Sequence, residues 1–369
     1  MPPVGGRVAL VHKPSPSTAE ASGLSGAPGC VHGDAMSSSP APSSPVAVHT
    51  PADVVLAAPL MLGYWPDNSL CAIFVDAEHR VVLIMRWDAD AATALADLPP
   101  PAARDGLLHA VHLVAYTAPV APGKSPAAPD PTAWRHAEDA LRDSGVSHGW
   151  LLAAGRDGDA VLWTSGDGGA GGLAVRVIDA TQVFRRAQRW GLTSWSDSRS
   201  EYVGDIATDP VACNRVAEKL RTLPPVMEEA SRDAAILAVR DRLADQQVSV
   251  GDIAEMLVSL TDVQVRDTVL WDLMHGDSSR WHVIAPRLAR LVAAAPETHV
   301  AAPATLLAIL RWQLGDGSRA SAAVTRALAA DPAYTLARLV DGCLATGMHP
   351  SVWRAGLAGL SREECRRAA

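Results

Sequence analysis

Residues 118–125 carry the spacing of a phosphate-binding loop. They read Ala-Pro-Val-Ala-Pro-Gly-Lys-Ser and follow a predicted strand, which fits the relaxed pattern with alanine for the first glycine. Such a loop binds phosphate because successive backbone amides converge on it and a helix begins at the Lys-Ser end. Pro119 and Pro122 remove two of those amides, and Pro126 disfavours a helix after Lys124. We therefore predict an exposed Pro-rich loop and no nucleotide hydrolysis.

A second stretch, Gly166-Asp167-Gly168-Gly169-Ala170-Gly171, has the spacing of a dinucleotide-binding fingerprint and follows strand-like residues 160–164. In that fold a helix must come next, with its N-terminus facing the pyrophosphate. Residues 173–178 instead read as a further strand, and Asp179 comes too early to bind a ribose. The stretch is interpreted as a Gly-rich loop, and no cofactor is predicted.

The histidines form no catalytic or metal-binding pattern. His109 and His112 lie three apart in a predicted strand, so they should point to opposite faces. His275 and His282 lie near predicted helix ends, where surface or capping positions are the simpler interpretation. The sequence contains no Gly-x-Ser-x-Gly elbow and no His-Glu-x-x-His helix. Neither a catalytic residue nor a metal ligand is predicted.

A polar turn with two aromatic residues is the best candidate for ligand binding. Asp53 is expected to cap a short helix that Pro59 breaks or kinks, and Gly63 permits a positive φ before the turn. One interpretation is a helix-to-strand corner that only builds the fold. The other is a recognition surface, because aromatic residues beside a polar turn are costly to leave in water. The residues of that surface would be Tyr64, Trp65, Asp67, Asn68 and Ser69.

Arg86 and Asp88 are the second candidate pair. They lie two apart on a predicted strand, so they share one face and can bind each other. The pair is either a solvated ion pair worth less than about 1 kcal/mol, or part of a cleft beside the 63–69 turn.

The segment from Pro59 to Val75 and the Arg86-Trp87-Asp88 pattern resemble DUF4192, a family of actinobacterial proteins of unknown function. The resemblance covers about residues 50–355. It implies an α/β part followed by helices, and it implies no activity.

Composition argues against several classes of partner. A net charge of −8 lacks the basic face that nucleic acids and anionic membranes require. No apolar run approaches the ~20 residues of a membrane helix. The five cysteines are odd in number and form no Cys-x-x-Cys pair, which fits a reducing cytoplasm better than a disulfide framework. We expect a cytoplasmic protein that binds neither nucleic acid nor membrane.

Three regions follow one another along the chain. Residues 1–49 are rich in Ser, Pro, Gly and Ala and are predicted to be disordered. Met36 precedes a Ser/Pro run and suggests a later translation start as a hypothesis. Residues 50–183 are predicted to form an α/β domain with a mixed sheet. Its predicted strands are 71–75, 81–87, 107–116, 150–154, 160–164 and 173–178, with helices near 91–98 and 132–144.

Residues 184–360 are predicted to form a helical array, which gives a mixed α+β fold overall. The predicted helices, separated by Pro, Gly or Asp, are 211–223, 226–245, 251–260, 263–274, 284–295, 304–314, 320–330 and 335–346. Trp190, Trp195, Glu201 and Tyr202 mark a predicted seam between the two parts.

Residues 301–334 resemble one tetratricopeptide unit. The resemblance departs at Ala304 and Arg311, where large aromatics usually stand, and no neighbouring unit repeats at a period of 34. An ordinary Ala-rich pair of helices is the equal alternative.

Two functions remain open. The favoured one is a non-enzymatic module that binds a protein or a small ligand. The alternative is an enzyme or nucleotide-binding protein with its site at the 63–69 turn, Arg86 and Asp88. The oligomeric state stays open.

Overall fold

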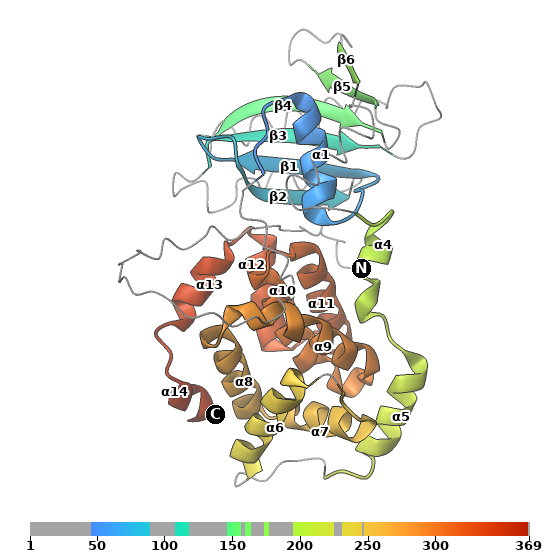
Figure 1. The fold of residues 1–369 in the computed structure, drawn as a ribbon, viewed down its shortest axis with the longest axis vertical. Coiled ribbons are helices and arrows are strands. Elements are labelled where there is room, and N and C mark those ends of the chain that lie inside the picture. Colours follow the sequence, from blue (N-terminus) through green and yellow to red (C-terminus); the bar gives the residue numbers. More distant parts are fainter. Residues whose placement is uncertain are drawn as a thin grey trace, which may run out of the picture.

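The structure is a computed structural model, and it describes residues 46–88, 108–117, 146–155, 159–163, 173–176, 195–224, 231–245 and 247–367. A sheet part comes first along the chain and a helical part follows (Figure 1). The predicted α+β class is confirmed. The phosphate-loop and Gly-rich stretches and the predicted helices 91–98 and 132–144 lie outside the described residues.

The sheet has the strand order β2-β1-β3-β4-β5-β6. Strands β3 and β4 are parallel, and the other neighbouring pairs are antiparallel, so the predicted mixed sheet is confirmed. All six predicted strands are present with shifted ends. They are β1 (Ser69–Val75), β2 (Val81–Asp88), β3 (Ala110–Tyr116), β4 (Ser147–Ala154), β5 (Asp159–Trp163) and β6 (Leu173–Arg176).

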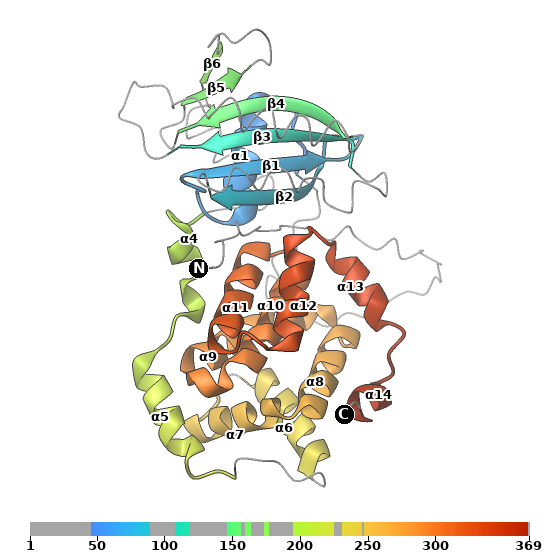
Figure 2. The same ribbon diagram turned by 180° about the vertical axis from the view of Figure 1, so that it is seen from behind.

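Helix α1 (Pro51–Leu62) lies across one face of this sheet (Figures 1 and 2). Asp53 is not the N-cap, and Pro59 does not break the helix. Thr50 is the N-cap, and Asp53 accepts the N–H of Thr50 at 2.9 Å in a capping box. The helix also continues through Pro59, although proline removes the bond to the carbonyl four residues earlier.

A distant hydroxyl compensates for that missing bond. Four residues before Pro59, the carbonyl of Val55 accepts a hydrogen bond from the buried Tyr116 hydroxyl at 2.5 Å. Tyr116 lies on β3, beneath the helix. The orphaned carbonyl is therefore satisfied by the sheet, and the helix ends three residues after the proline.

Strands β1, β2 and β3 are buried on both faces, as predicted for the third strand. Ile73 and Val114 face α1, in a cluster that also contains Val55. Leu83 and Leu113 belong to a second cluster, which continues through the helical part. The sheet therefore packs on both sides, and near-continuous apolar strands suit that position.

Residues 46–49, which the sequence places in the disordered tail, belong to the fold. Val46 and Val48 are 1% exposed. The Val81 N–H donates to the Val46 carbonyl at 2.7 Å, and the Val48 N–H donates to the His79 carbonyl at 2.9 Å. The prediction of disorder is therefore wrong for residues 46–49, where two valines supply the apolar contact.

The helical part lies next to the β2 edge of the sheet (Figures 1 and 2). Its predicted helices are confirmed with shifted ends, and the short α4, α13 and α14 were not predicted. The α-helices are α4 (Arg199–Tyr202), α5 (Pro210–Leu220), α6 (Arg232–Ala244), α7 (Val250–Thr261), α8 (Val263–His275), α9 (Trp281–Ala294), α10 (Ala301–Gln313), α11 (Gly317–Ala330), α12 (Thr335–Ala345), α13 (Pro350–Leu357) and α14 (Arg362–Arg367). Single 3₁₀ turns are η3 (Gly204–Ile206), η5 (Ser278–Arg280) and η6 (Glu297–His299).

Helices α10 and α11 are the pair that resembles a tetratricopeptide unit. Ala308, Ala320, Val324 and Ala327 are all fully buried, which fits packing positions between two close helices. Arg311 is also buried, where the repeat would have a large aromatic. The assignment to that repeat stays a prediction.

Among the described residues, no helix is both long enough and apolar enough to cross a membrane.

Candidate functional site

The 63–69 turn begins at a glycine that the fold requires. Gly63 ends α1 with φ +83°, and its N–H donates to the Pro59 carbonyl at 3.0 Å. A Cβ on Gly63 would lie 2.3 Å from Cε2 of Tyr202. Both the left-handed backbone and the close approach of the ring demand glycine here.

Tyr64 and Trp65, the two aromatics of the turn, are in the interior. They are 0% and 5% exposed. The Tyr64 ring lies 5.7 Å from the Tyr202 ring, and Trp65 meets Tyr116 edge-on at 5.4 Å between ring centroids. Neither aromatic is available at the surface, and the ligand-binding role predicted for them stays a prediction.

The polar residues of the turn fold the chain back on itself. Asn68 is exposed with φ 47°. Ser69 is 1% exposed, and its hydroxyl donates to the Asp67 carbonyl at 2.8 Å. This is the local bonding that makes such residues frequent in turns, and it supports the corner interpretation of the segment.

Arg86 and Asp88 lie beside this turn, on edge strand β2. The strand register places Ser69 opposite Asp88 and Cys71 opposite Arg86. Arg86 Nη2 lies 2.6 Å from Asp88 Oδ1, so the predicted pair forms. Arg86 is only 8% exposed, however, and its Nε has no hydrogen-bond partner. The structure thus brings together Ser69, Arg86 and Asp88, in an ion pair whose arginine is buried and whose carboxylate is exposed.

A hollow of about 350 Å³ lies where the sheet part meets the helical part, and we call it the junction pocket. It adjoins the turn through Gly63, but none of the seven predicted ligand-binding residues lines it. Its lining residues are Gly63, Trp195, Ser196, Asp197, Glu201, Tyr202 and Arg319.

Residues 195–202 connect the two parts through their backbone. They include Trp195, Glu201 and Tyr202 of the predicted seam, and Trp190 lies outside the described residues. The Ser196 N–H donates to the Gly63 carbonyl at 2.8 Å, and the Trp65 N–H donates to the Ser196 carbonyl at 3.2 Å. Ser198 then caps α4, and Glu201 Oε2 accepts the Asp197 N–H at 2.9 Å. The pocket wall is therefore held in place by hydrogen bonds along its length.

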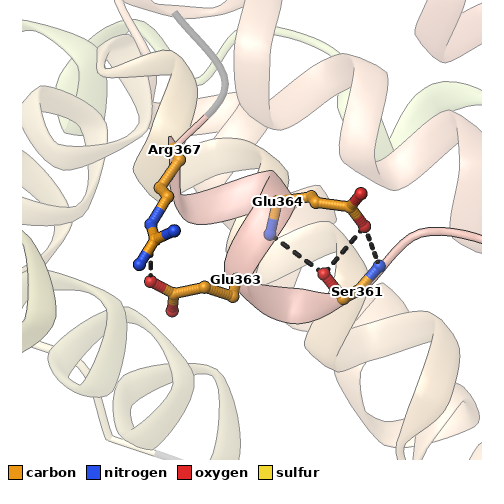
Figure 3. Close-up of a pocket in the computed structure, with 4 residues that line it drawn as sticks. All are labelled: Ser361, Glu363, Glu364 and Arg367. Atoms are coloured by element: carbon orange, nitrogen blue, oxygen red, sulfur yellow. Dashed lines mark hydrogen bonds and ion pairs between the residues drawn. The ribbon is translucent and has the colours of Figure 1, made fainter.

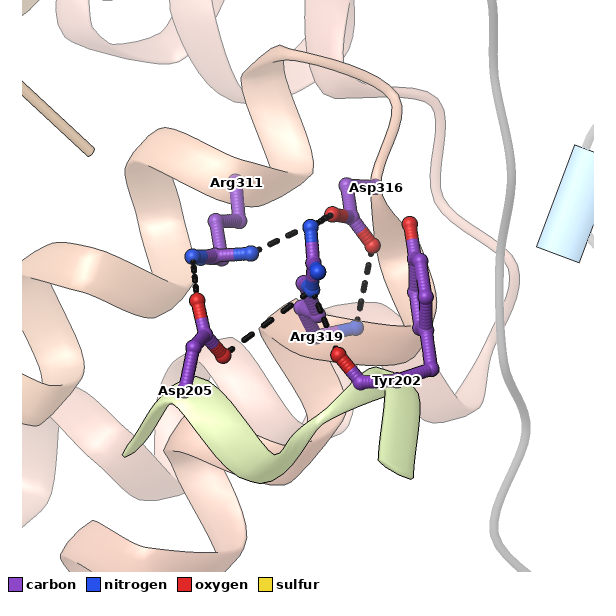
Figure 4. A network of polar contacts seen from close by, with 5 residues as sticks. All are labelled: Tyr202, Asp205, Arg311, Asp316 and Arg319. Atoms are coloured by element: carbon purple, nitrogen blue, oxygen red, sulfur yellow. Dashed lines mark hydrogen bonds and ion pairs between the residues drawn. The ribbon is translucent and has the colours of Figure 1, made fainter. Parts of the chain in front are cut away.

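A network of charged residues supports the pocket from the helical side (Figure 4). Arg311 is 5% exposed and binds both Asp205 and Asp316. The Arg319 guanidinium stacks 4.0 Å from the Tyr202 ring centroid, and its Nε donates to the Tyr202 carbonyl at 2.8 Å. Three separate segments, 202–205, α10 and α11, are thus joined at one place.

Burial shifts the pKa of two members of this network. It raises the pKa of the Asp316 carboxyl, and the neighbouring Arg311 and Arg319 oppose that effect. It also raises the pKa of the Tyr202 phenol, chiefly by desolvation, with Asp316 adding to the effect. Tyr202 therefore stays protonated at neutral pH. At Asp316, burial favours the neutral carboxyl and the two arginines favour the charged carboxylate.

Little in the sequence indicates this network. Asp205 and Arg311 lie 106 residues apart, so no local spacing connects them. The one usable signal is Arg311 itself, an arginine at a position where the tetratricopeptide pattern has a large aromatic residue.

His112 is the other unusual titratable group. Its ring stacks on Trp150 at 4.9 Å, its Nδ1 accepts the Trp150 N–H at 3.1 Å, and its Nε2 is buried without a partner. Desolvation lowers the pKa of His112 to about 4, and His79 adds to this shift. His112 is therefore a neutral core residue of β3. His109 lies just before that strand.

The other hollows offer less chemistry. The groups around the hollow of about 430 Å³ on α14 bind each other, Ser361 to Glu364 and Arg367 to Glu363 (Figure 3). A hollow of about 110 Å³ between α6, α7 and α9 is too small for most metabolites. Within the described residues, no group of three or more His, Cys, Asp or Glu residues could hold a metal ion.

Comparison with protein-family models identifies the family to which this chain belongs. Residues 51–351 match the model described as "Domain of unknown function (DUF4192)". The chain belongs to the DUF4192 family. No curated protein and no solved structure matches it.

The DUF4192 match begins at the first residue of α1 and ends just inside α13. It therefore contains the 63–69 turn, the junction pocket and the whole charged network. The hollow on α14 lies outside the matched residues. The junction pocket is larger than the hollow between α6, α7 and α9, which also lies within the matched residues.

Proposed function

We propose that this DUF4192 domain is a non-enzymatic binding module and that the junction pocket is its site for a small polar ligand. The observation that carries the proposal is the position of the pocket, between the sheet part and the helical part. Ligand sites occur preferentially where two structural units meet, because side chains from both can converge there.

The lining residues suit a polar molecule. Glu201 is exposed at the pocket and offers a carboxylate, and Ser196 adds a hydroxyl. Trp195 and Tyr202 supply aromatic surface on which a planar or aliphatic group can rest. A ligand held here would gain its specificity from hydrogen bonds to groups that the fold already fixes.

A binding role is favoured over catalysis because the charged groups behind the pocket are already paired. Asp316 binds two arginines, and Arg319 is held by Tyr202 and Asp316. A general base or nucleophile needs a lone pair free to reach the substrate. In the described part of the chain, no lining side chain forms the nucleophile and base pair that acyl transfer or hydrolysis would use.

A thermal-shift screen of the full chain against nucleotides, amino acids, amines and sugar phosphates tests the proposal. We expect at least one compound to raise the melting temperature saturably, and Glu201→Gln to weaken that effect at least tenfold. Glu201→Gln keeps an oxygen that can accept the Asp197 N–H, so the wall should stay in place. Glu218→Gln, an equal charge change on the exposed face of α5, should leave the effect unaltered.

A flat screen, or stabilisation that Glu201→Gln and Glu218→Gln change equally, would contradict the proposal. Stabilisation by a nucleotide that depends on Asp88 and not on Glu201 would favour the alternative site at the 63–69 turn.

A further inference from the structure

A small hollow in the helical part has an apolar interior and arginines on its rim. It lies between α6, α7 and α9, and α6 and α7 form the end of this part that is farthest from the sheet (Figures 1 and 2). Its volume is about 110 Å³, whereas a cavity of about 150 Å³ holds a benzene molecule. The hollow therefore has room for one aliphatic side chain, and we call it the α9 hollow.

The interior of the α9 hollow is apolar and partly open to solvent. Its apolar lining residues are Leu243, Met256 and Leu291, which are buried, and Val248 and Ile253, which are half-buried. Water in such a place finds few polar partners, so an apolar side chain that displaces it gains free energy. A well-packed apolar pocket of this size is the usual receptor for an anchoring side chain at a protein interface.

Two arginines on the rim have no carboxylate to bind. Arg287 and Arg290 both lie on α9, whose 14 residues include no Asp or Glu. Arg287 Nη1 donates to the Leu243 carbonyl at 2.7 Å, and Arg290 is exposed. Among the described residues, neither arginine forms an ion pair. Like charges three residues apart on a helix are neighbours and repel each other, so a carboxylate from outside would relieve that repulsion.

The carboxylates near the hollow are engaged elsewhere. Arg242, the third arginine of the lining, binds Asp252 at 2.8 Å and Glu255 at 2.5 Å. Asp245 is the one carboxylate of the lining, and its Oδ1 accepts the Gln247 N–H at 3.1 Å. The rim therefore carries an excess of positive charge, although the chain as a whole carries a net charge of −8.

An exposed apolar residue continues this surface along α9. Val283 is 51% exposed, and it lies four residues before Arg287 and seven before Arg290. All three side chains therefore share one face of the helix. Arginine is enriched at protein interfaces relative to the rest of the surface, and here it borders apolar surface on two sides.

We propose that the α9 hollow is a docking site for an acidic segment of a partner protein. One side chain of the segment, of the Leu, Ile or Met type, enters the hollow, and Asp or Glu residues beside it bind Arg287 and Arg290. An arginine can bind a carboxylate through two parallel hydrogen bonds, which would fix the register of the segment along α9. The site is separate from the junction pocket and does not depend on a ligand there.

Short synthetic peptides are the probes. Each has one variable residue at its centre, flanked on both sides by Glu, Lys or Ser, and its binding to the full chain is measured by fluorescence polarisation up to about 1 mM. We expect saturable binding of peptides with Leu, Ile or Met between glutamates. Alanine at the centre, or lysines in the flanks, should weaken binding at least tenfold. Added salt should also weaken it, because the charges of the rim are open to solvent.

The variants test the arginine and the hollow separately. Arg290→Glu should weaken binding of the best peptide at least tenfold, and Arg338→Glu, the same change on an exposed arginine of α12, should leave it unaltered. Neither arginine binds another described side chain, so both variants should melt like wild type. Val248→Phe fills the hollow and should remove the preference for leucine over alanine. Glu201→Gln should not change peptide binding, which separates this inference from the proposed function.

Three results would overturn the inference: no peptide that binds saturably, equal binding of peptides with lysine and glutamate flanks, or equal weakening by Arg290→Glu and Arg338→Glu. Light scattering of the protein alone gives a fourth. A wild-type dimer that Arg290→Glu converts to a monomer would make a second copy of this chain the occupant of the hollow, in place of an acidic partner.

Discussion

The Tyr202 ring lies so close to Gly63 that a Cβ at residue 63 would come within 2.3 Å of its Cε2 atom. The contact joins the end of α1 to α4, and through α4 to the charged network of the helical part. Four predictions follow from this contact and from other features of the fold.

Gly63→Ala should lower the free energy of unfolding by roughly 2 to 4 kcal/mol, because alanine is strained at positive φ and displaces the Tyr202 ring. Urea unfolding followed by circular dichroism measures the change. Gly342→Ala is the matched control, since nothing lies within 4 Å of its added Cβ in α12. A Gly63→Ala variant as stable as Gly342→Ala would disprove the close contact.

Tyr116→Phe should cost about 1 to 3 kcal/mol, because it leaves the Val55 carbonyl buried without a donor. Pro59→Ala should rescue part of that loss, since alanine restores an N–H four residues after Val55. A double-mutant cycle by chemical denaturation measures the coupling. Additive effects of the two substitutions would mean that the Tyr116 hydroxyl does not replace the bond lost at Pro59.

Arg311→Ala should destabilise the protein by about 3 kcal/mol, because it leaves the buried Asp316 with a weaker set of partners. Arg311→Ala/Asp316→Asn should recover much of this loss, since the amide carries no charge. Arg80→Ala removes an exposed ion pair of the β1–β2 turn and should change little. Equal effects of Arg311→Ala and Arg80→Ala on the unfolding midpoint would refute a structural role for the network.

His112 should make the protein less stable in acid. Its pKa falls from 6.5 in the unfolded chain to about 4 in the fold, so protons bind the unfolded chain more tightly. Stability should therefore drop as the pH falls from 6.5 to 4, by about 3 kcal/mol in total. His112→Gln lacks this titration. The difference in unfolding free energy between wild type and His112→Gln, measured between pH 7 and pH 4, should shrink as the pH falls, and a constant difference would refute the shift.

The sequence predicted the parts of the fold that rest on local periodicity. The six strands and the long helices of the second half carry their own apolar pattern, so only their ends moved. Residues 46–49 and the short α4, α13 and α14 have too few apolar residues for a pattern to appear.

Prediction from the sequence failed where the structure around one residue depends on a partner that is distant in the sequence. Pro59 was expected to break or kink α1 because nothing near it in sequence replaces the lost hydrogen bond, and the Tyr116 hydroxyl lies 61 residues from the Val55 carbonyl that it binds. The polar turn was found, but burial of Tyr64 and Trp65 depends on residues 195–202 and on α11. The junction pocket and its charged network arise from segments that only the fold brings together.

The hydroxyl that completes α1 also constrains the order in which this protein can assemble. During synthesis Val55 leaves the ribosome 61 residues before Tyr116 does. Until that strand has docked, the Val55 carbonyl has only water to bond, and loop closure over this distance must precede the gain. Helix α1, although it precedes every described strand, completes its hydrogen bonding only on a sheet that has already formed.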